Sequence, residues 1–356
     1  MNVWKQRASA LVQPLAAVAI GLAALAVAVA LVGGSVAEAY IELWRGAFGN
    51  FYYFTNTLTR AIPILLIAVG LSLAFRAGFF NLGAEGQMVL GGISAALTAL
   101  YLPAPGPVRL VAAIAAGMAA GGLWAAFAGW LNARFRINLL ISTLLMNYIA
   151  TYFAAYLVTV PFKDNTGSAA LPQTEMIDPS AWLPKLFAGS SLHAGFWLAV
   201  AATVIVYVIM KHTVYGYQFN MIGSNPLFAA YGGIRRGPML VAGLFISGCL
   251  AGLAGVSEVL GMQYRYLDGA LTTPGYAWSG LMAALIAGSH PIGAALAAIL
   301  LAALQTGAMG LERNTEVPLE VASVIQATVV LFVSAKLGIG WLKRRRKGRT
   351  TDGAAV

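Results

Sequence analysis

Charged side chains are scarce in this sequence: lysine, arginine, aspartate and glutamate together make up 10% of its 356 residues. Soluble globular domains carry about 25%. Hydrophobic residues account for 60% of the chain, and the mean hydropathy is +0.78. A soluble fold of this length has too little interior to bury so much apolar surface. These values exclude an ordinary water-soluble protein and indicate one that is solvated by lipid.

Cysteine and histidine are also rare, with one cysteine, Cys249, and three histidines. A single cysteine excludes an intramolecular disulfide and a multi-cysteine metal site. No metal site is expected at His290 either, because it has no adjacent acidic partner and the other two histidines fall on other loops. The sequence lacks a GxxxxGK[ST] phosphate loop and the HExxH, CxxC and GxSxG motifs. We therefore expect no ATP hydrolysis, no enzymatic activity and no cofactor in this chain.

What the sequence does contain is a series of long apolar segments. A helix that spans a bilayer needs about 20 apolar residues, and the run after the short basic N-terminus is long enough for a retained first helix. Segment 276–288 is too short to span and fits a half-helix held against protein. The sequence predicts an all-α, polytopic membrane protein with about ten transmembrane segments. They are roughly 12–32, 58–76, 85–103, 107–131, 139–160, 194–211, 238–260, 276–288, 291–309 and 318–338.

The basic residues predict an orientation. With the N-terminus in the cytoplasm and the segments alternating, fifteen of the 22 lysines and arginines lie inside and seven outside. Because cytoplasmic loops are enriched in these residues, both termini are predicted to be cytoplasmic. Residues 1–342 then form one transmembrane domain with an outer loop at 161–193 and a cytoplasmic loop at 212–237. The basic tail 343–356 follows a span directly, so it is expected to anchor on anionic lipid and not to bind nucleic acid.

The cytoplasmic loop 212–237 carries the signals of a short helix. Ser224 or Asn225 can cap its start, Pro226 suits its first turn, and the pair Gly232–Gly233 can end it. The sequence therefore predicts one short amphipathic helix on the cytoplasmic face.

Polar residues interrupt the apolar pattern first between Arg76 and Gln87, where one helix ends and another begins. Glu85 near a helix N-terminus is favoured by the helix dipole, and Arg76 is placed to pair with it. Phe80 and Asn81 lie in the connecting stretch. Two interpretations stay open here, a gate beside a transport pathway and a cytoplasmic turn held by an Arg76–Glu85 pair.

A second polar group lies on the segment 139–160, where Thr143 and Asn147 share a helix face and Ser142 is adjacent. Tyrosines recur every four residues along the neighbouring stripe, with Tyr152 at its centre. Amide and hydroxyl groups beside aromatic rings can hold a planar polar ligand such as a base or a sugar. The alternative is hydrogen bonding between helices, which is common for such residues in membranes.

Two further stretches complete the set of candidates. The small residues from Ser247 to Gly255 favour close helix packing, with Glu258 beyond them as a rim contact or an interfacial charge. Trp278, in the short segment, suits a membrane-interface anchor or a pathway wall. The candidate pathway residues are Phe80, Asn81, Glu85, Gln87, Ser142, Thr143, Asn147, Tyr152, Ser247 and Trp278.

Several motifs resemble one family of transport proteins. They are FRAGFFNLGAEGQMVLGG at 75–92, ISTLLMNYIA at 141–150, GSNPLFAAYGGI at 223–234, SGCLAGLAGVSEVLG at 247–261 and the long stretch at 275–308. Together they resemble the permease subunits of bacterial ABC importers in the branch that handles branched-chain amino acids and simple sugars. The nucleoside importers of that branch, of the guanosine type, are the most similar, and the resemblance covers about residues 55–340.

The resemblance implies a multi-pass permease of the bacterial inner membrane that works by alternating access. It implies three partners: an ABC ATPase subunit that binds ATP, a second permease of a different chain, and an extracytoplasmic substrate-binding lipoprotein. The motif at 223–234 corresponds to the loop that docks on the ATPase. The coupling residues implied are Gly223, Ser224, Asn225, Ala229, Ala230 and Gly233.

Other functions remain as alternatives. Within the same family, the ligand of the permease is a simple sugar or a branched-chain amino acid. An ion-coupled secondary transporter would need acidic residues deep in its helices, and only Glu85 and Glu258 come near this, both close to segment ends. A membrane enzyme would need clustered catalytic groups at one interface, which the sequence does not show.

Overall fold

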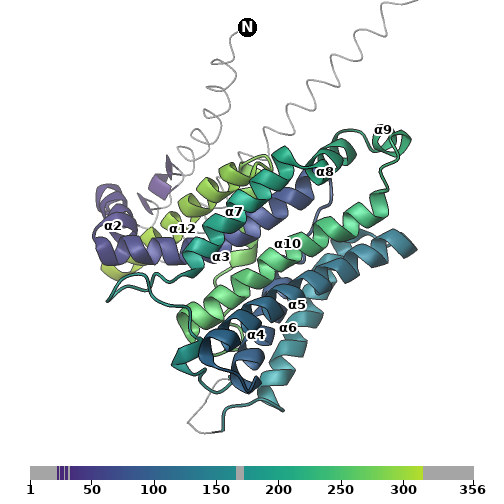
Figure 1. Cartoon of the computed structure of the whole chain (residues 1–356). Helices are drawn as coiled ribbons and strands as arrows, with labels where there is room; N and C mark the ends of the chain where they lie inside the picture. The colour runs from purple at the N-terminus through teal and green to yellow at the C-terminus, as the bar shows by residue number, and fades with distance from the viewer. Residues whose placement is uncertain (1–21, 24, 28, 31–32, 166–171, 316–356) are drawn as a thin grey trace, which may run out of the picture. The chain divides into compact units, whose positions relative to one another are not determined.

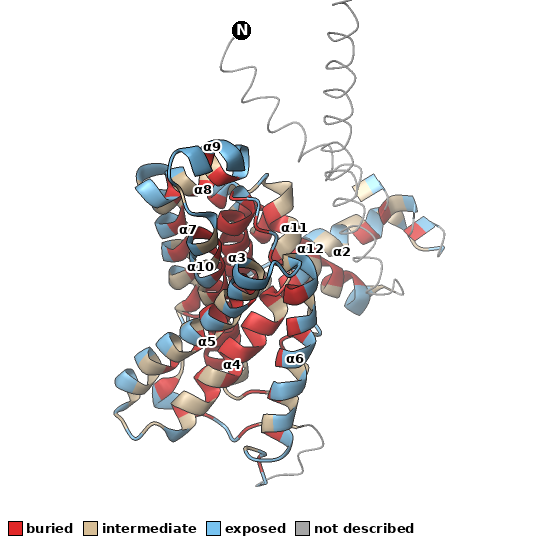
Figure 2. Cartoon of the chain, turned by 90° about the vertical axis from the view of Figure 1, so that its right-hand side faces the viewer, coloured by how far each residue is buried: buried red, intermediate tan, exposed pale blue. Residues whose placement is uncertain are grey.

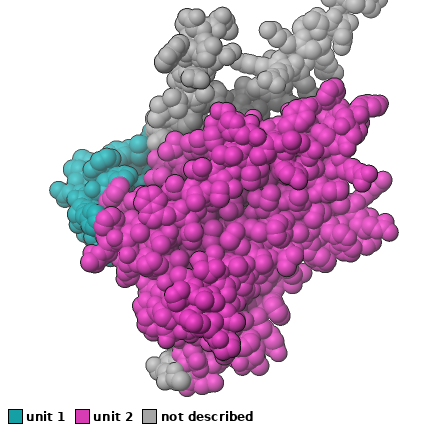
Figure 3. Space-filling view, viewed as in Figure 1, with its two compact units in different colours: residues 1–53, 303–356 teal, residues 54–302 magenta. Residues whose placement is uncertain are grey.

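Helices make up nearly all of the regular structure in the computed structural model of this chain (Figure 1). The model describes residues 22–23, 25–27, 29–30, 33–165 and 172–315. Within that part, strand pairing is limited to two isolated bridges, so the all-α prediction is confirmed. The predicted segment 318–338 and the tail 343–356 lie outside the described residues, as does most of 12–32. Two compact units are distinguished, residues 1–53 with 303–356 and residues 54–302 (Figure 3).

Six helices in the described part are long and apolar enough to cross a bilayer, which confirms a polytopic membrane protein. Each one overlaps a predicted segment. They are α3 (Phe51–Arg76), α5 (Gly106–Phe135), α6 (Leu139–Thr159), α7 (Gly195–His212), α10 (Arg236–Glu258), which continues as the π-helical turn η2 (Val259–Gln263), and α12 (Pro291–Asn314).

Two further predicted segments are helical but less suited to spanning. Helix α4 (Ala84–Tyr101) carries Glu85 and Gln87 in its first turn, and these lower its hydropathy. Helix α11 (Tyr276–Ile286) has only 11 residues, as the short segment 276–288 predicted. At about 1.5 Å per residue, α11 covers roughly half of the hydrocarbon core.

Helix α3 supplies the core of the unit 54–302. Every residue from Ala61 to Phe75 is buried, and Figure 2 shows buried residues gathered in the interior of the helices, with exposed residues around them. The sequence of this buried stretch is apolar on nearly all sides, a pattern that belongs to a helix surrounded either by protein or by lipid. Here neighbouring helices surround it, so the centre of this unit excludes both water and lipid.

Glycines let α4, α5 and α10 approach closely. Gly91, Gly117 and Gly121 on the first two helices face Gly248 and Gly252 on α10. A methyl group added to Gly121 would lie 2.8 Å from the Cα of Gly252, closer than real side chains come. The small-residue stretch of α10 is therefore a packing surface, as predicted, and it brings three helix backbones together.

The unit formed by the ends of the chain contains a helix that the sequence pattern did not predict, α2 (Val36–Phe48). Within this unit α2 packs on the end of α12, where Gly46 meets Gly310 and the Glu42 carboxylate accepts a hydrogen bond from Asn314 at 2.7 Å. Its 13 residues are too few to span, and charged residues interrupt them, so a search for long apolar runs misses this helix.

The described part of the loop 161–193, predicted to lie outside, is folded against the end of α10. Its backbone pairs with the segment after α10, for example from the Ile177 N–H to the Tyr264 carbonyl at 2.8 Å and from Leu183 to Leu260 at 2.9 Å. The Trp182 ring stacks on Tyr264 with centroids 3.9 Å apart. These contacts fix the loop as a cap over that end of α10.

His193 at the end of this cap should make stability depend on pH. Burial, and the Lys185 ammonium nearby, lower the pKa of His193 to about 4, and its Nδ1 accepts a hydrogen bond from the Gly195 N–H. In the unfolded chain the pKa is about 6.5. Between pH 6.5 and 4 the unfolded chain takes up a proton that the folded chain excludes. Lowering the pH over this range therefore decreases the free energy of unfolding by roughly 3 kcal/mol.

The measurement is thermal or denaturant unfolding of the full chain in detergent between pH 4 and 8. His193→Asn retains a hydrogen-bond acceptor but does not titrate, so its stability should fall less than that of the wild type below pH 6.5. The same change at exposed His290 is the control and should follow the wild type. Parallel curves for the wild type and His193→Asn would contradict the assignment.

The loop 212–237, predicted to be cytoplasmic, contains two helices, α8 (Val214–Ser224) and α9 (Pro226–Tyr231), where the sequence predicted one. The prediction for α9 is confirmed in detail: the Asn225 side chain accepts from the Phe228 N–H at 3.0 Å, and Pro226 is the first residue. Gly233 has φ +78°, as a chain reversal after a helix requires. Helix α8 was missed because its own cap, Thr213, lies directly after α7 and the apolar run of α7 masks this start.

Candidate functional site

A group of hydrogen-bonded polar side chains is buried where α4 begins. The amides of Asn81 and Gln87 bond each other in both directions, at 3.1 and 3.0 Å. Asn81 also donates to the Ser247 hydroxyl of α10 at 3.3 Å. All three side chains are buried, so these three predicted pathway residues contact one another and tie α4 to α10.

The polar group on α6 holds the same turn from the other side. The Asn147 oxygen accepts from the Gly86 N–H at 2.9 Å, and its nitrogen donates to the Leu82 carbonyl at 2.8 Å. The Thr143 hydroxyl accepts from the Leu82 N–H at 3.2 Å, while Ser142 donates to the carbonyl one turn earlier in its own helix. These contacts match the interhelical hydrogen bonding that was the alternative to a ligand contact.

The predicted pair between Arg76 and Glu85 is wrong. Arg76 donates from its Nε to the side-chain oxygen of Asn220 on α8 at 2.7 Å. Glu85 instead shares a hydrogen bond with the side chain of Trp278 on α11. The reason is that α8 packs directly on the end of α3, where Gly223 touches the Arg76 carbonyl. The arginine therefore lies beside α8.

Beside this turn lies a cavity of about 270 Å³ with a mixed polar and aromatic wall. Its residues come from α4, α6, α11 and the loop before α11. They are Glu85, Leu144, Asn147, Tyr148, Thr151, Tyr152, Thr272 and Trp278.

The geometry separates the predicted pathway residues into three sets. Glu85, Tyr152 and Trp278 line the cavity, together with Asn147, whose amide is already engaged. Phe80 lies outside the wall and packs on Phe75 with ring centroids 5.0 Å apart. The remaining candidates form buried polar contacts: Ser142 donates within its own helix, and the others position the turn before Glu85.

Sequence reasoning missed some of the lining. Thr151 lies four residues after Asn147, so helical spacing was a signal that would have found it. Thr272 lies in an irregular loop, and no periodic pattern points to it. Tyr148 belongs to the predicted tyrosine stripe, and both Tyr148 and Tyr152 are largely exposed in this chain.

The coupling residues implied by the resemblance surround α9. Asn225 caps this helix, Gly233 ends it, Ala229 is buried beneath it and Ala230 is exposed. Ser224 is the last residue of α8 and not a cap, and Gly223 lies against the end of α3. The structure thus connects α9 through α8 to α3, the most buried of the six described spans.

Large apolar side chains on α9 were not singled out from the sequence. Leu227, Phe228 and Tyr231 are exposed, and Tyr231 retains 92% of its accessible surface. Three such side chains on a six-residue helix form an apolar patch, here called the α9 patch. Exposed apolar patches of this kind mark surfaces that bind other proteins or membranes.

Glu258 differs from the expectation of a rim contact or interfacial charge. It is 4% exposed, at the end of α10, where it hydrogen-bonds the Tyr276 side chain and lies near the cation of Arg60. A carboxylate enclosed in this way is held by partners from two other helices, α11 and α3. It joins the three helices internally.

Comparison with known proteins gives the family. Residues 53–334 match the family model described as branched-chain amino acid transport system / permease component. The guanosine ABC transporter permease protein NupP of Bacillus subtilis is 34% identical over 96% of this chain and 99% of its own length. The glucose ABC transporter permease protein of Haloferax volcanii is 33% identical over 93% and 89%.

A nucleoside ABC transporter permease protein of Lactococcus lactis is 29% identical over 91% of this chain and 90% of its own length. No solved structure matches the chain significantly. The family match covers most of the chain and agrees with the apolar helices described above. The chain belongs to the family of branched-chain amino acid transport system permease components and is a multi-pass ABC transporter permease of the cytoplasmic membrane, not itself an enzyme.

Proposed function

We propose that this permease imports nucleosides, as one subunit of an ATP-driven importer. The observation that carries the proposal is the 34% identity to a guanosine permease over nearly the full length of both chains. The nucleoside permease of Lactococcus lactis supports the same ligand class. A simple sugar is the second candidate, because the glucose permease of Haloferax volcanii is nearly as similar.

The cavity beside Glu85 offers the groups that a nucleoside requires. Tyr148, Tyr152 and Trp278 present aromatic faces on which a base can stack. The Glu85 carboxylate and the Thr151 hydroxyl supply hydrogen-bonding partners for a base edge or a ribose hydroxyl. At about 270 Å³ the cavity is slightly smaller than the usual range for small-molecule sites, about 300–1,000 Å³.

We infer the partner subunits from the family and from two exposed surfaces of this chain. The α9 patch would dock on the ABC ATPase subunit, which binds the ATP. Exposed apolar residues on one side of α6, including Leu145, Tyr152 and Tyr156, would face a second permease. A different chain is proposed for that second permease, because NupP and a second guanosine permease protein of Bacillus subtilis, NupQ, both match this chain.

The orientation proposed is the one that the basic residues favour, with both termini in the cytoplasm. It places α8 and α9 inside and the capped end of α10 outside, facing an extracytoplasmic substrate-binding lipoprotein. In the proposed cycle, ATP binding and hydrolysis in the partner move α9. Helix α8 passes the movement to the end of α3, and the cavity beside Glu85 opens to one side of the membrane at a time.

The experiment is uptake into vesicles that contain this permease and its partner subunits. Unlabelled guanosine, other nucleosides, glucose and leucine compete against a labelled nucleoside. Competition by nucleosides alone is expected. Competition by glucose would favour the sugar reading, and competition by leucine would overturn both.

Glu85→Gln tests the cavity in the same assay. Because hydrogen bonds to a charged group contribute about 1.5–3 kcal/mol, we expect nucleoside uptake to fall about tenfold or more. Glu175→Gln in the exposed outer loop is the matched control and should transport normally. Unchanged uptake by Glu85→Gln would remove the cavity from the pathway.

A further inference from the structure

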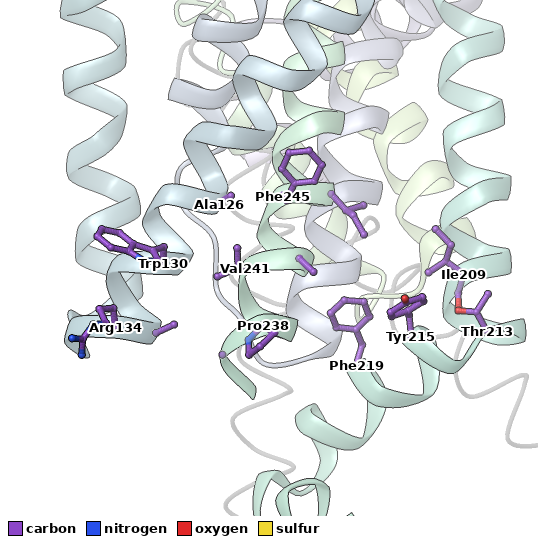
Figure 4. Close-up of a pocket in the computed structure, with 14 residues that line it drawn as sticks. Ala126, Trp130, Arg134, Ile209, Thr213, Tyr215, Phe219, Pro238, Val241 and Phe245 are labelled. Atoms are coloured by element: carbon purple, nitrogen blue, oxygen red, sulfur yellow. The ribbon is translucent and has the colours of Figure 1, made fainter. Parts of the chain in front are cut away.

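An open apolar groove lies between α5, α7, α8 and α10 (Figure 4) and shares no lining residue with the cavity beside Glu85. Its volume is about 950 Å³. The walls are built mainly of hydrocarbon, with Trp130, Phe219, Val241 and Phe245 among the lining side chains. Three of the four helices are membrane spans. A groove of this composition between spans is a site where lipid chains replace water.

Charge is confined to one end of the groove. Figure 4 shows Arg134 and Tyr215 at the same end as Pro238, while Ala126 and Phe245 line the opposite end. Arg134 lies in the last turn of α5 and its side chain is exposed. Among the described residues, no carboxylate forms an ion pair with it.

A second arginine, Arg236, is the first residue of α10 and precedes the groove residue Gly237. Helices α5 and α10 meet here, since a methyl group on Gly237 would lie 3.6 Å from the Ala133 side chain. Arg134 and Arg236 are the sequence neighbours of these two contact residues. The groove therefore has a basic end, whose arginines form no ion pair with a described carboxylate, and an apolar wall.

We propose that this groove binds one anionic phospholipid. The acyl chains lie along the wall formed by Trp130, Val241 and Phe245, and the phosphate pairs with Arg134. Arginine forms paired hydrogen bonds with phosphate oxygens, and its charge favours an anionic headgroup over a zwitterionic one. With the proposed orientation, the basic end lies in the cytoplasmic leaflet, where anionic lipids attract basic residues.

A lipid bound in this groove would contact α8, which takes part in the proposed coupling. Phe219 and Tyr215 belong to α8, the helix that lies between the α9 patch and the end of α3. A bound lipid therefore contacts the element through which the proposed coupling passes. The lipid site itself does not depend on the ligand being a nucleoside.

The test is native mass spectrometry of the full-length chain with phosphatidylglycerol or phosphatidylcholine of the same acyl chains. The wild type should retain one phosphatidylglycerol more tightly than phosphatidylcholine. Arg134→Ala should weaken phosphatidylglycerol about fivefold, the equivalent of about 1 kcal/mol per basic residue, and leave phosphatidylcholine unchanged.

Filling the groove provides a second, independent variant. Ala242→Trp places a large ring at an exposed lining position and should reduce retention of both lipids. Ala201→Trp, at an exposed position of α7 outside the groove, should behave as the wild type. Equal retention of the two lipids by the wild type would overturn the proposal. So would lipid retention that neither variant reduces, which would leave the groove to another protein segment.

Discussion

Nucleoside uptake should be lost when the α9 patch is made acidic by the double substitution Leu227→Asp and Tyr231→Asp. Both side chains are exposed, so the change should leave the fold of the permease intact. Two carboxylates would have to lose their hydration at an apolar interface, which costs several kcal/mol each. Pull-down of the ATPase subunit and uptake in the same vesicles would measure the loss.

A matched control separates docking from general damage. Met176 is also an exposed apolar residue, but it lies in the loop 161–193, on the side proposed to face outward, so Met176→Asp should bind the ATPase and transport normally. Substitution of the pair Ala229–Ala230 by aspartate is a less specific test. Ala229 is the buried residue of α9, and an aspartate there would unfold the helix. Full ATPase binding by the Leu227/Tyr231 variant would refute the docking surface.

Gly252→Ala should prevent the chain from accumulating as a folded protein. The added methyl group would collide with the Gly117 carbonyl and lie 3.3 Å from the Cα of Gly121. Both are backbone atoms in α5, so the collision is relieved only by moving a whole helix. Overpacking typically costs about 1–3 kcal/mol, and we expect the upper end because no side chain can rotate away.

The control is the same substitution on the same helix. A methyl group on Gly237 would meet nothing closer than the Ala133 side chain at 3.6 Å. Gly237→Ala should therefore be neutral or stabilise by up to about 1 kcal/mol, since alanine favours helix. Membrane abundance and thermal unfolding in detergent compare the two variants. Equal stability would mean that α5 and α10 pack less tightly than described.

Local patterns predicted the elements well where one rule decides the outcome. Long apolar runs predicted the six spans, and the sequence from Asn225 to Gly233 predicted α9 with its cap, its first-turn proline and its terminal glycine. The small residues around Gly252 predicted close packing. In each case the signal lies within a few residues of the element that it describes.

The hydrogen-bond partners of individual polar side chains could not be predicted in the same way. Arg76 and Glu85 are nine residues apart, yet each bonds a residue far along the chain, Asn220 and Trp278. Polar residues on α6 had two open readings, and the choice depended on how close the α4 backbone comes to Asn147. The distances between such groups depend on how whole helices pack, which cannot be derived from local patterns in a single sequence.

The contact between α8 and the end of α3 limits how this protein can be recombined with its relatives. Arg76 bonds Asn220, and the lack of a side chain at Gly223 lets α8 sit on the Arg76 carbonyl. A chimaera that exchanges residues 214–231 to suit a foreign ATPase therefore cuts through this contact. Residues 76, 220 and 223 depend on one another structurally. A functional chimaera therefore has to take all three from the same parent protein.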